Sequence, residues 1–239
     1  AYNAEAGTAN LHLYKEPRFY ASVGYDRGTY EVDGKEIILY LRGDELHGST
    51  LKETDEYQSC TGYLCQKWIP KASTYNATSN SFSYYYYAYP YLRLPELYLS
   101  YAEADFEYNG SLSAQSIEYI NRVRERCGLP TFQDSWALAG GIPTGQKLRK
   151  VLHQERSIEF LFEGRRFHDL RRWKEAFEVM NKQPRSWNRD GKTAEEFYRV
   201  IEANQGGRKR IFESPKSYWM AVPMSEINKN PNLVQNPGY

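Results

Sequence analysis

The chain of 239 residues carries 31 Lys and Arg against 30 Asp and Glu, and the resulting net charge of +1 argues against bulk nucleic acid as a partner. It is long enough for one large domain or two small ones, and it has no run of about 20 apolar residues that would span a membrane. Aromatic residues make up 15% of the chain, with 22 tyrosines, which suits either a wet binding surface or the rim of a core.

The first 90 residues are predicted to form long irregular loops with a few short strands. β-like runs such as FYASVGY (19–25) and EIILYL (36–41) are separated by glycines. The stretch SFSYYYYAYP (81–90) is typical of an extended segment that ends before Pro90. Long irregular segments in a compact protein are commonly functional, so a binding site is expected in this region.

Residues 91–180 predict helices in pairs. An apolar face runs from Leu94 to Phe106 at helical spacing, and Gly110 follows as the left-handed terminator. Ser113 is placed to cap a second helix, which closes near Pro130. After a linker over 131–145, residues 146–163 and 165–180 predict another pair. Helix pairs are the unit of tetratricopeptide-like solenoids, although no strict 34-residue repeat is present.

The stretch ERSIEFLFEGRRFHDLRRW (155–173) combines an apolar helical stripe with many charges. The spacing pairs Arg165 and Arg166 with Asp169, so we expect these side chains and the nearby loop backbone to satisfy one another where two helices meet at Gly164. His168 next to Asp169 is not a catalytic pair, because adjacent helical residues point about 100° apart. A structural role is therefore predicted for this stretch.

The last part of the chain is polar and irregular. The basic cluster GRKR (207–210) predicts a solvated face, as such clusters usually do in a neutral protein. The tail from 218 to 239 contains a short apolar run followed by Asn-Pro steps, which favour turns. We expect it to lie as an irregular strap over the body.

Five segments, in this order along the chain, resemble the signature segments of one known family. They are EPRFYASV (16–23), YPYLRLPELYLSYAEADFEYNG (89–110), INRVRERCGLP (120–130), ERSIEFLFEGRRFHDLRRW (155–173) and YWMAVPMSEINKNPNLVQNPGY (218–239). Together they are similar to the C-terminal half of the SusD-like (RagB/SusD) nutrient-uptake proteins. Cys127 stands where alanine is usual in the family.

The resemblance implies a mainly α fold of tetratricopeptide-like helix pairs with long irregular loops and a few short strands. It implies one C-terminal RagB/SusD-type domain over 1–239, divided into a loop-rich ligand-facing region (1–90), helix pairs (91–180), and a variable loop with the C-terminal strap (181–239). Family members are about twice as long. The N-terminal half would carry the signal peptide and the lipidated cysteine, so this chain is expected to be a C-terminal portion.

The resemblance also implies a function. The protein would be a surface-exposed outer-membrane lipoprotein of a Bacteroidetes-type bacterium, and it would bind an oligosaccharide or, in some members, a peptide. It would deliver this ligand to a SusC-like TonB-dependent transporter. It would not be an enzyme, and neither a cofactor nor nucleic acid is implied.

The family's ligand contacts come mainly from variable loops, so the matching segments identify no contact residue. The candidate ligand-binding residues are therefore chosen by their chemistry. A sugar ring packs its apolar face on an aromatic plane while amides bind its hydroxyls. The loop 43–80 combines both, with Gln58, Gln66, Asn76 and Asn80 as the amides. Its aromatic candidates, in order, are Trp68, then Tyr57, Tyr63 and Tyr75. Tyr25 and Tyr30 follow, and the loop around Trp187 and Asn188 comes last. Trp68 is equally suited to anchor the loop to the core.

Alternatives of other classes stay open. One is an intracellular tetratricopeptide scaffold for protein partners. Another is an α-helical glycoside hydrolase, which needs two carboxylates across a sugar cleft. The acids available for it in the loop are Asp44, Glu45, Glu53, Asp55 and Glu56. A calcium site among them has no D-x-D-x-D-G loop to support it.

The three cysteines predict no metal site. Cys60 and Cys65 are close enough to pair in a loop, and Cys127 lies in a helical pattern where it is expected to be buried. No pair of Cys or His residues stands beside them, as a zinc site would need.

Overall fold

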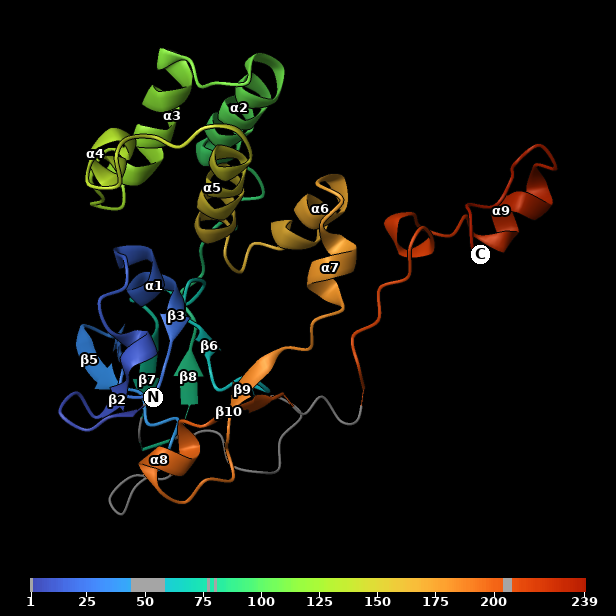
Figure 1. The fold of residues 1–239 in the computed structure, drawn as a ribbon. Coiled ribbons are helices and arrows are strands. Elements are labelled where there is room, and N and C mark those ends of the chain that lie inside the picture. Colours follow the sequence, from blue (N-terminus) through green and yellow to red (C-terminus); the bar gives the residue numbers. More distant parts are fainter. Residues whose placement is uncertain (1, 44–58, 77, 80, 204–207) are drawn as a thin grey trace.

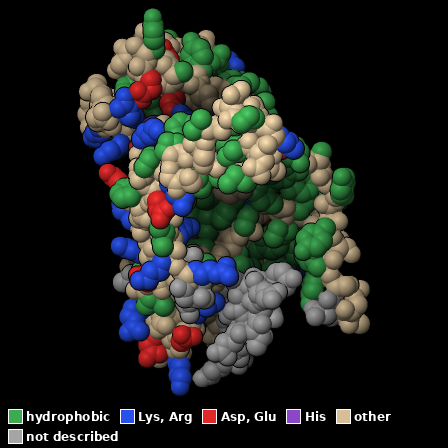
Figure 2. Space-filling view, turned by 90° about the vertical axis from the view of Figure 1, so that its right-hand side faces the viewer, with side chains coloured by type: hydrophobic (Ala, Val, Ile, Leu, Met, Phe, Trp, Pro, Cys, Tyr) green, Lys and Arg blue, Asp and Glu red, His purple; other side chains and the backbone are tan. Residues whose placement is uncertain are grey.

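A computed structural model describes residues 2–43, 59–76, 78–79, 81–203 and 208–239. Helices α2 to α7 form one half of the molecule and short β-ribbons form the other, while the C-terminal segment extends to one side (Figure 1). Seen from that side, the molecule is hollowed in the middle, and hydrophobic side chains line much of the hollow (Figure 2). Within the described ranges no helix is long and apolar enough to cross a membrane. The predicted fold class, mainly helical with short strands, is confirmed.

The first predicted helix pair is confirmed. Helix α2 spans Leu94–Asn109 and ends at Gly110, whose φ of 71° is left-handed. Helix α3 spans Ala114–Glu125, and the Ser113 side chain caps it by accepting a hydrogen bond from the Ser116 amide. The Asp105 carboxylate of α2 accepts from the Ser113 amide at 2.8 Å, so the short turn is tied to both helices. Local capping therefore sets the angle at which α3 returns along α2.

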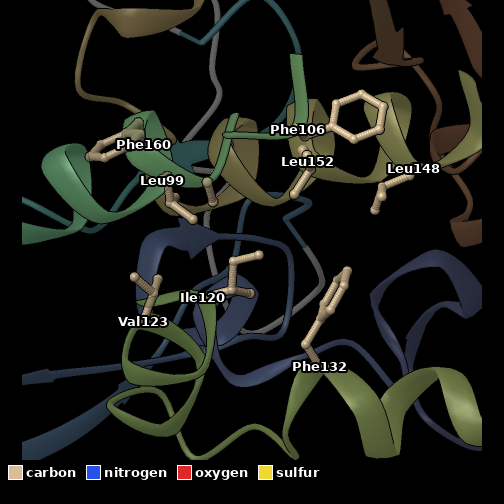
Figure 3. Packing of buried hydrophobic residues seen from close by; sticks show 9 residues of the cluster. Leu99, Phe106, Ile120, Val123, Phe132, Leu148, Leu152 and Phe160 are labelled. Carbon is tan, nitrogen blue, oxygen red and sulfur yellow. The ribbon is translucent and has the colours of Figure 1, made fainter. Parts of the chain in front are cut away.

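The main core lies between α2, α3, α4 (Phe132–Ala137) and α5 (Gly145–Glu159), with α5 packed against α2. Its buried side chains come from all four helices (Figure 3): Leu99, Ala102, Phe106, Ile120, Val123, Phe132, Leu148, Leu152 and Phe160. Helix α4 lies within the segment 131–145, which was predicted to be only a linker. Thr131 caps it by accepting from the Asp134 amide, and Phe132 is only 1% exposed. Six residues are too few to show a helical period in the sequence.

The second predicted pair is partly wrong. The sequence pattern predicted one helix over 165–180, but the chain forms α6 (Arg165–Arg172) and α7 (Ala176–Met180) with a break at Lys174, where φ is 62°. Helix α6 begins after Gly164, whose φ is 74°. Leu170 and Ala176 bury against Phe212 in a second core cluster. The break allows both short helices to reach that cluster.

The other half of the described chain is built from two-stranded antiparallel ribbons. They pair β1 (Tyr2–Asn3) with β2 (Thr8–Ala9), β3 (Val23–Gly24) with β6 (Leu64–Cys65), β4 (Thr29–Val32) with β5 (Lys35–Ile38), β7 (Thr74–Asn76) with β8 (Ser81–Ser83), and β9 (Arg185–Trp187) with β10 (Val200–Glu202). Short helical turns lie between them: η1 (Asn10–His12), α1 (Pro17–Ser22) and α8 (Ala194–Phe197). The three cysteines are free thiols.

Helix α1 corrects the β-like interpretation of the run FYASVGY. Its first four residues belong to α1, and only Val23 and Gly24 form a strand. Pro17 at the first helical position presets the backbone for a helix, which outweighs the β preference of the aromatic residues that follow.

The C-terminal tail folds mainly on itself, so the prediction of a strap over the body is wrong for its last part. It contains η2 (Lys216–Tyr218) and α9 (Met224–Lys229). The Tyr218 hydroxyl donates to the Lys174 carbonyl at 3.1 Å and holds the start of the tail to the helices. Beyond it, the Gln235 amide bonds both backbone groups of Val222, at 2.8 and 2.9 Å. The segment then projects away from the helical half (Figure 1).

The charges of 155–173 pair mostly with other elements. The buried Asp169 carboxylate accepts from Arg156 Nε at 2.8 Å and from Arg172 Nε at 3.0 Å. Arg165 and Arg166 were predicted to pair with Asp169, but they bond to α2 and α5 instead, so that pairing is wrong. Asp169 thus joins α5 to α6 across the buried face, and the expected structural role of the stretch fits this position.

We expect Asp169→Ala to lower the free energy of unfolding by about 3–5 kcal/mol, because it removes the carboxylate to which the buried Arg156 donates its Nε–H. Ligand affinity should change much less. Denaturant unfolding of the variant and of the exposed control Glu178→Ala measures the difference. An unchanged melting temperature with abolished ligand binding would contradict the structural role.

Candidate functional site

The C-terminal end of α5 organises the loop that carries the predicted ligand-binding residues. The last carbonyls of a helix have no partner within it and must find one elsewhere. Lys67 Nζ donates to the carbonyls of Glu159 and Leu161, at 2.9 and 3.2 Å. Trp68 Nε1 donates to the Phe162 carbonyl at 2.9 Å. Lys67 therefore caps the last residue of α5, and Lys67 and Trp68 together bond to the turn that follows, which attaches the loop to the helical half.

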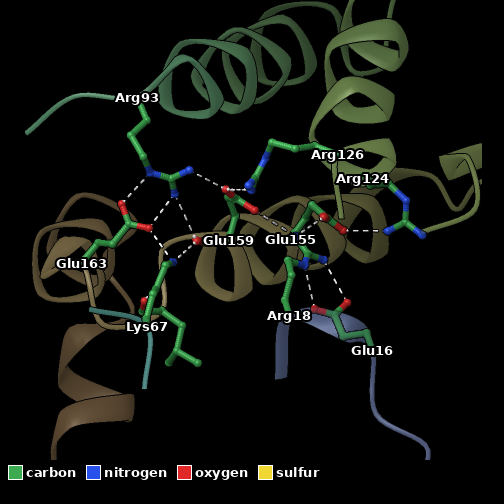
Figure 4. A network of polar contacts seen from close by, with 10 residues as sticks. Glu16, Arg18, Lys67, Arg93, Arg124, Arg126, Glu155, Glu159 and Glu163 are labelled. Carbon is green, nitrogen blue, oxygen red and sulfur yellow. Dashed lines mark hydrogen bonds and ion pairs between the residues drawn. The ribbon is translucent and has the colours of Figure 1, made fainter. Parts of the chain in front are cut away.

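A network of charges surrounds the same helix end (Figure 4). Glu159 is 2% exposed, and its carboxylate lies 2.9 Å from Arg93 Nη1 and 2.7 Å from Arg126 Nη2. Glu155, one turn earlier, lies 2.8 Å from Arg18 Nη1 and 2.9 Å from an Arg124 nitrogen. These cations come from α1, from the residue before α2 and from the end of α3. The network therefore joins the ribbon half to the helical half.

Glu163 closes the network beside the loop. Its carboxylate lies 2.6 Å from Lys67 Nζ and 2.5 Å from Arg93 Nη2. Burial by itself would raise the pKa of Glu163, but the hydrogen bonds from Arg93 and Lys67 outweigh burial and hold the pKa below its usual value. The carboxylate is therefore charged, and it fixes the position of Lys67 and of the neighbouring Trp68.

Three aromatic side chains form a continuous series next to this anchor, which we call the aromatic ridge: Trp68, Tyr89 and Tyr91. The rings of Trp68 and Tyr89 have centroids 4.7 Å apart, and those of Tyr89 and Tyr91 are 5.5 Å apart. Tyr89 is 47% exposed and Tyr91 is 85% exposed, whereas Trp68 is half-buried. Successive rings are tilted by 45° and 76°, so the ridge presents ring faces in more than one direction.

Backbone contacts hold the ridge in place although its segment has no regular secondary structure. The Tyr87 hydroxyl donates to the Trp68 carbonyl at 3.1 Å. Arg165 Nη2 at the start of α6 donates to the Tyr91 carbonyl at 2.6 Å. The ridge is thus attached at both ends, and its exposed rings are positioned before any ligand arrives. A pre-ordered aromatic surface of this kind is suited to stack against the apolar face of a sugar ring.

A second exposed aromatic group lies on the β7–β8 ribbon. Tyr75 on β7 is opposite Phe82 on β8, and the Phe82 and Tyr84 rings are 4.7 Å apart. Tyr75 is 46% exposed and Tyr84 is 77% exposed. Tyr30 is half-buried, and burial together with the nearby Tyr84 raises its pKa. Of the predicted residues, Tyr75 and Tyr30 therefore lie near this group and Trp68 lies in the ridge.

Tyr25 and Tyr63 lie instead in an aromatic cluster around the buried His12. The Tyr63 hydroxyl is 3.0 Å from His12 Nε2, and the Thr8 hydroxyl is 2.7 Å from Nδ1. The Tyr25 ring centroid is 4.7 Å from that of His12. Burial raises the pKa of Tyr63 to about 12. Both tyrosines are half-buried here and contribute to packing.

Several predicted residues lie outside the described residues: Tyr57, Gln58, Asn80 and the acids Asp44, Glu45, Glu53, Asp55 and Glu56. In the parts of the chain that are described, no group of three His, Cys, Asp or Glu side chains could hold a metal ion. Trp187, the last aromatic candidate, is 3% exposed.

The sequence interpretation missed Tyr89 and Tyr91. It identified 81–90 as extended but sought the site in the preceding loop. The available signal was the density of tyrosines from 84 to 91, because so many amphipathic rings in an extended segment cannot all be buried.

Comparisons with known proteins agree with this architecture. The model of the SusD family matches residues 2–239. The SusD-like protein P2 of Formosa agariphila is 28% identical over 150 residues, which are 62% of this chain and 25% of that protein. Glycan-binding proteins of the SusD family are non-catalytic, which agrees with the expectation that this chain is not an enzyme.

Two solved structures show the same fold. The structure named BT4246 has a TM-score of 0.78 at 29% identity, over 94% of this chain and 36% of that chain. A SusD-like carbohydrate binding protein from Bacteroides fragilis has a TM-score of 0.64 at 25% identity, over 94% of this chain and 42% of that chain. The chain therefore spans less than half the length of each of these structures.

We expect Trp68→Phe to lower the free energy of unfolding by about 0.5–1.5 kcal/mol, since it removes the hydrogen bond to the Phe162 carbonyl and keeps an aromatic ring. The exposed Trp219→Phe is the matched control and should change stability less. Urea unfolding measures both variants. Equal effects would show that the indole N–H does not anchor the loop.

We expect the protein to lose stability as the pH falls from about 6.5 toward 4. Burial, with a smaller contribution from Lys15, lowers the pKa of His12 to about 4, so the unfolded chain binds a proton that the folded protein does not. This group contributes a slope of up to about 1.4 kcal/mol per pH unit. The free energy of unfolding, measured between pH 7 and pH 5, should change less with pH for His12→Gln than for the unchanged protein. The exposed His168→Gln should keep the original pH dependence. If His12→Gln kept the same dependence of unfolding free energy on pH, His12 would not be the group responsible.

Proposed function

The chain belongs to the SusD family of glycan-binding proteins, and from this premise we propose that it captures an oligosaccharide on the aromatic ridge. The observation that carries the proposal is the series of the half-buried Trp68 and the exposed Tyr89 and Tyr91, whose rings are in contact and whose backbone is fixed on both sides. Successive sugar units of a chain would stack along successive rings.

The physical chemistry of the ridge favours a glycan. Each pyranose ring has one face of axial C–H groups, and an exposed tyrosine or tryptophan offers a rigid aromatic plane with a polar tip. Stacking on rings that are already ordered loses little conformational entropy on binding. The similar structure from Bacteroides fragilis is a SusD-like carbohydrate binding protein, which supports the same ligand class.

Within this proposal the residues have different roles. Tyr89 and Tyr91 supply open ring faces. Trp68 supplies part of its ring and holds the loop through its N–H, so both of its predicted roles are combined in one side chain. Tyr75 on the neighbouring ribbon is a secondary contact for a longer ligand.

The place of the protein in uptake is also part of the proposal. A SusD-family glycan binder would work at the outer surface of a Bacteroidetes-type bacterium as a lipoprotein, and it would pass its ligand to a SusC-like TonB-dependent transporter. Family membership and the organisms of the relatives support this arrangement. Co-purification of the full-length protein with such a transporter from native membranes tests it.

We expect Tyr91→Ala and Tyr89→Ala each to weaken binding about tenfold, as the loss of about 1.4 kcal/mol of stacking would. Affinity electrophoresis through gels that carry a panel of polysaccharides measures this, with retardation by at least one polysaccharide expected for the unchanged protein. The matched controls are Tyr14→Ala and Tyr108→Ala, which remove tyrosines that are 100% and 90% exposed outside the ridge.

Retardation that is equal for ridge and control variants would move the site away from the ridge. Absence of retardation by any polysaccharide, together with peptides that co-purify with the native protein, would replace the glycan with a peptide ligand.

A further inference from the structure

An open trough of about 850 Å³ lies between the end of α7 and the β9–β10 ribbon, away from the aromatic ridge. Lys182 and Gln183 line it from the segment after α7. Arg185 lines it from β9, and residues 200–202 line it from β10. The proposed glycan function does not use this surface.

One edge of β10 faces the trough with unpaired backbone groups. Val200 is opposite Trp187 in the ribbon. The Trp187 amide donates to the Thr61 carbonyl, which lies on the side of β9 away from β10, so Val200 and Trp187 exchange no hydrogen bonds with each other. In an antiparallel ribbon such pairs alternate with bonded ones. Val200 and Glu202 therefore direct their N–H and C=O groups away from β9. In the part of the chain that the structure describes, neither residue has a partner for these groups.

The lining of the trough carries more positive than negative charge. Lys182 and Arg185 line it, and Glu202 is the acid among its lining residues. The Gln183 side chain bonds both the N–H and the C=O of Arg210, at 3.0 Å each. This reciprocal pair holds the Arg210 backbone beside the trough, and the exposed Arg208 and Lys209 directly precede it in the chain. Among the described residues, none of these five cations has a carboxylate partner.

A smaller apolar pocket opens from the same place. It has a volume of about 150 Å³ and shares Arg185 and Val200 with the trough. Its other lining residues are Leu11, Tyr63, Ser186 and Trp187. Leu11 is 53% exposed and Val200 is also 53% exposed, so this pocket could accept an apolar side chain directly beside the strand edge.

We propose that β10 and its trough form a docking site for an extended acidic segment of a partner protein, which adds to β10 as a further strand. Outward backbone groups two residues apart, about 7 Å along the strand, match the repeat of an extended peptide. Acidic side chains on that peptide meet the unpaired cations, and an apolar side chain enters the small pocket. An anionic polysaccharide would satisfy the cations but has no backbone to pair with the strand edge.

Fluorescence anisotropy of the full chain with a labelled ten-residue peptide that alternates glutamate and valine tests the proposal. Two further peptides carry N-methyl groups on all valines or on all glutamates. Each therefore lacks the N–H donors along one edge of the extended peptide. We expect one of them to bind like the parent peptide and the other to lose binding. Val200→Pro, which removes an outward N–H, should weaken binding about tenfold.

Charge variants separate binding at the trough from non-specific electrostatic attraction. The double variant Lys182→Glu with Arg185→Glu should weaken the peptide about tenfold or more, whereas Lys192→Glu, an exposed lysine outside the trough, should not. Tyr91→Ala should leave peptide binding unchanged, so failure of this proposal differs from failure of the glycan proposal. Equal binding of both N-methylated peptides overturns the proposal. So does binding of polygalacturonate through the same cations without binding of the peptide.

Discussion

The constraint on which the rest of the structure depends is the C-terminal end of α5. This helix ends with carbonyl groups that lack partners and with glutamates whose negative charge is unfavourable at a helix C-terminus. Both problems have one solution, which is to bring cations to this point from elsewhere in the chain. Lys67 and Arg93 contact both the carbonyls and the carboxylates. The helix end therefore determines where the loop after β6 and the start of α2 must lie.

The aromatic ridge is a consequence of that arrangement. Lys67 places its neighbour Trp68, and Arg93 places the start of α2, so the chain between them is fixed at both ends. The segment that carries Tyr89 and Tyr91 runs between those two points without regular secondary structure. Its rings remain exposed because its backbone is held by contacts such as that of Arg165 with Tyr91. An irregular segment thus becomes a surface with a defined shape.

The ridge and the β10 trough use different physical interactions on separate surfaces. The ridge offers aromatic faces and little charge, which suits a neutral, hydroxyl-rich ligand. The trough offers a strand edge and unpaired cations, which suits an extended acidic peptide. Tyr63 and Trp187 line the small pocket beside the trough and also pack around His12, so the trough rests on a rigid aromatic cluster.

The sequence by itself determined the features that depend on short-range interactions. Helices α2 and α3, the left-handed Gly110 and the Ser113 cap were all predictable, because capping and helical periodicity act within a few residues. The ordered series of five family-like segments was also sufficient to identify the family.

Only the tertiary structure decided which charges pair and which aromatic rings stay exposed. Asp169 pairs with Arg156, thirteen residues earlier, and with Arg172 on its own helix, but not with Arg165 or Arg166 as predicted. Tyr25 and Tyr63 looked like Tyr89 and Tyr91 in the sequence, yet the first two pack around His12 and the last two remain exposed. The physical reason is that burial and ion pairing depend on which distant segments meet. No local pattern records that information.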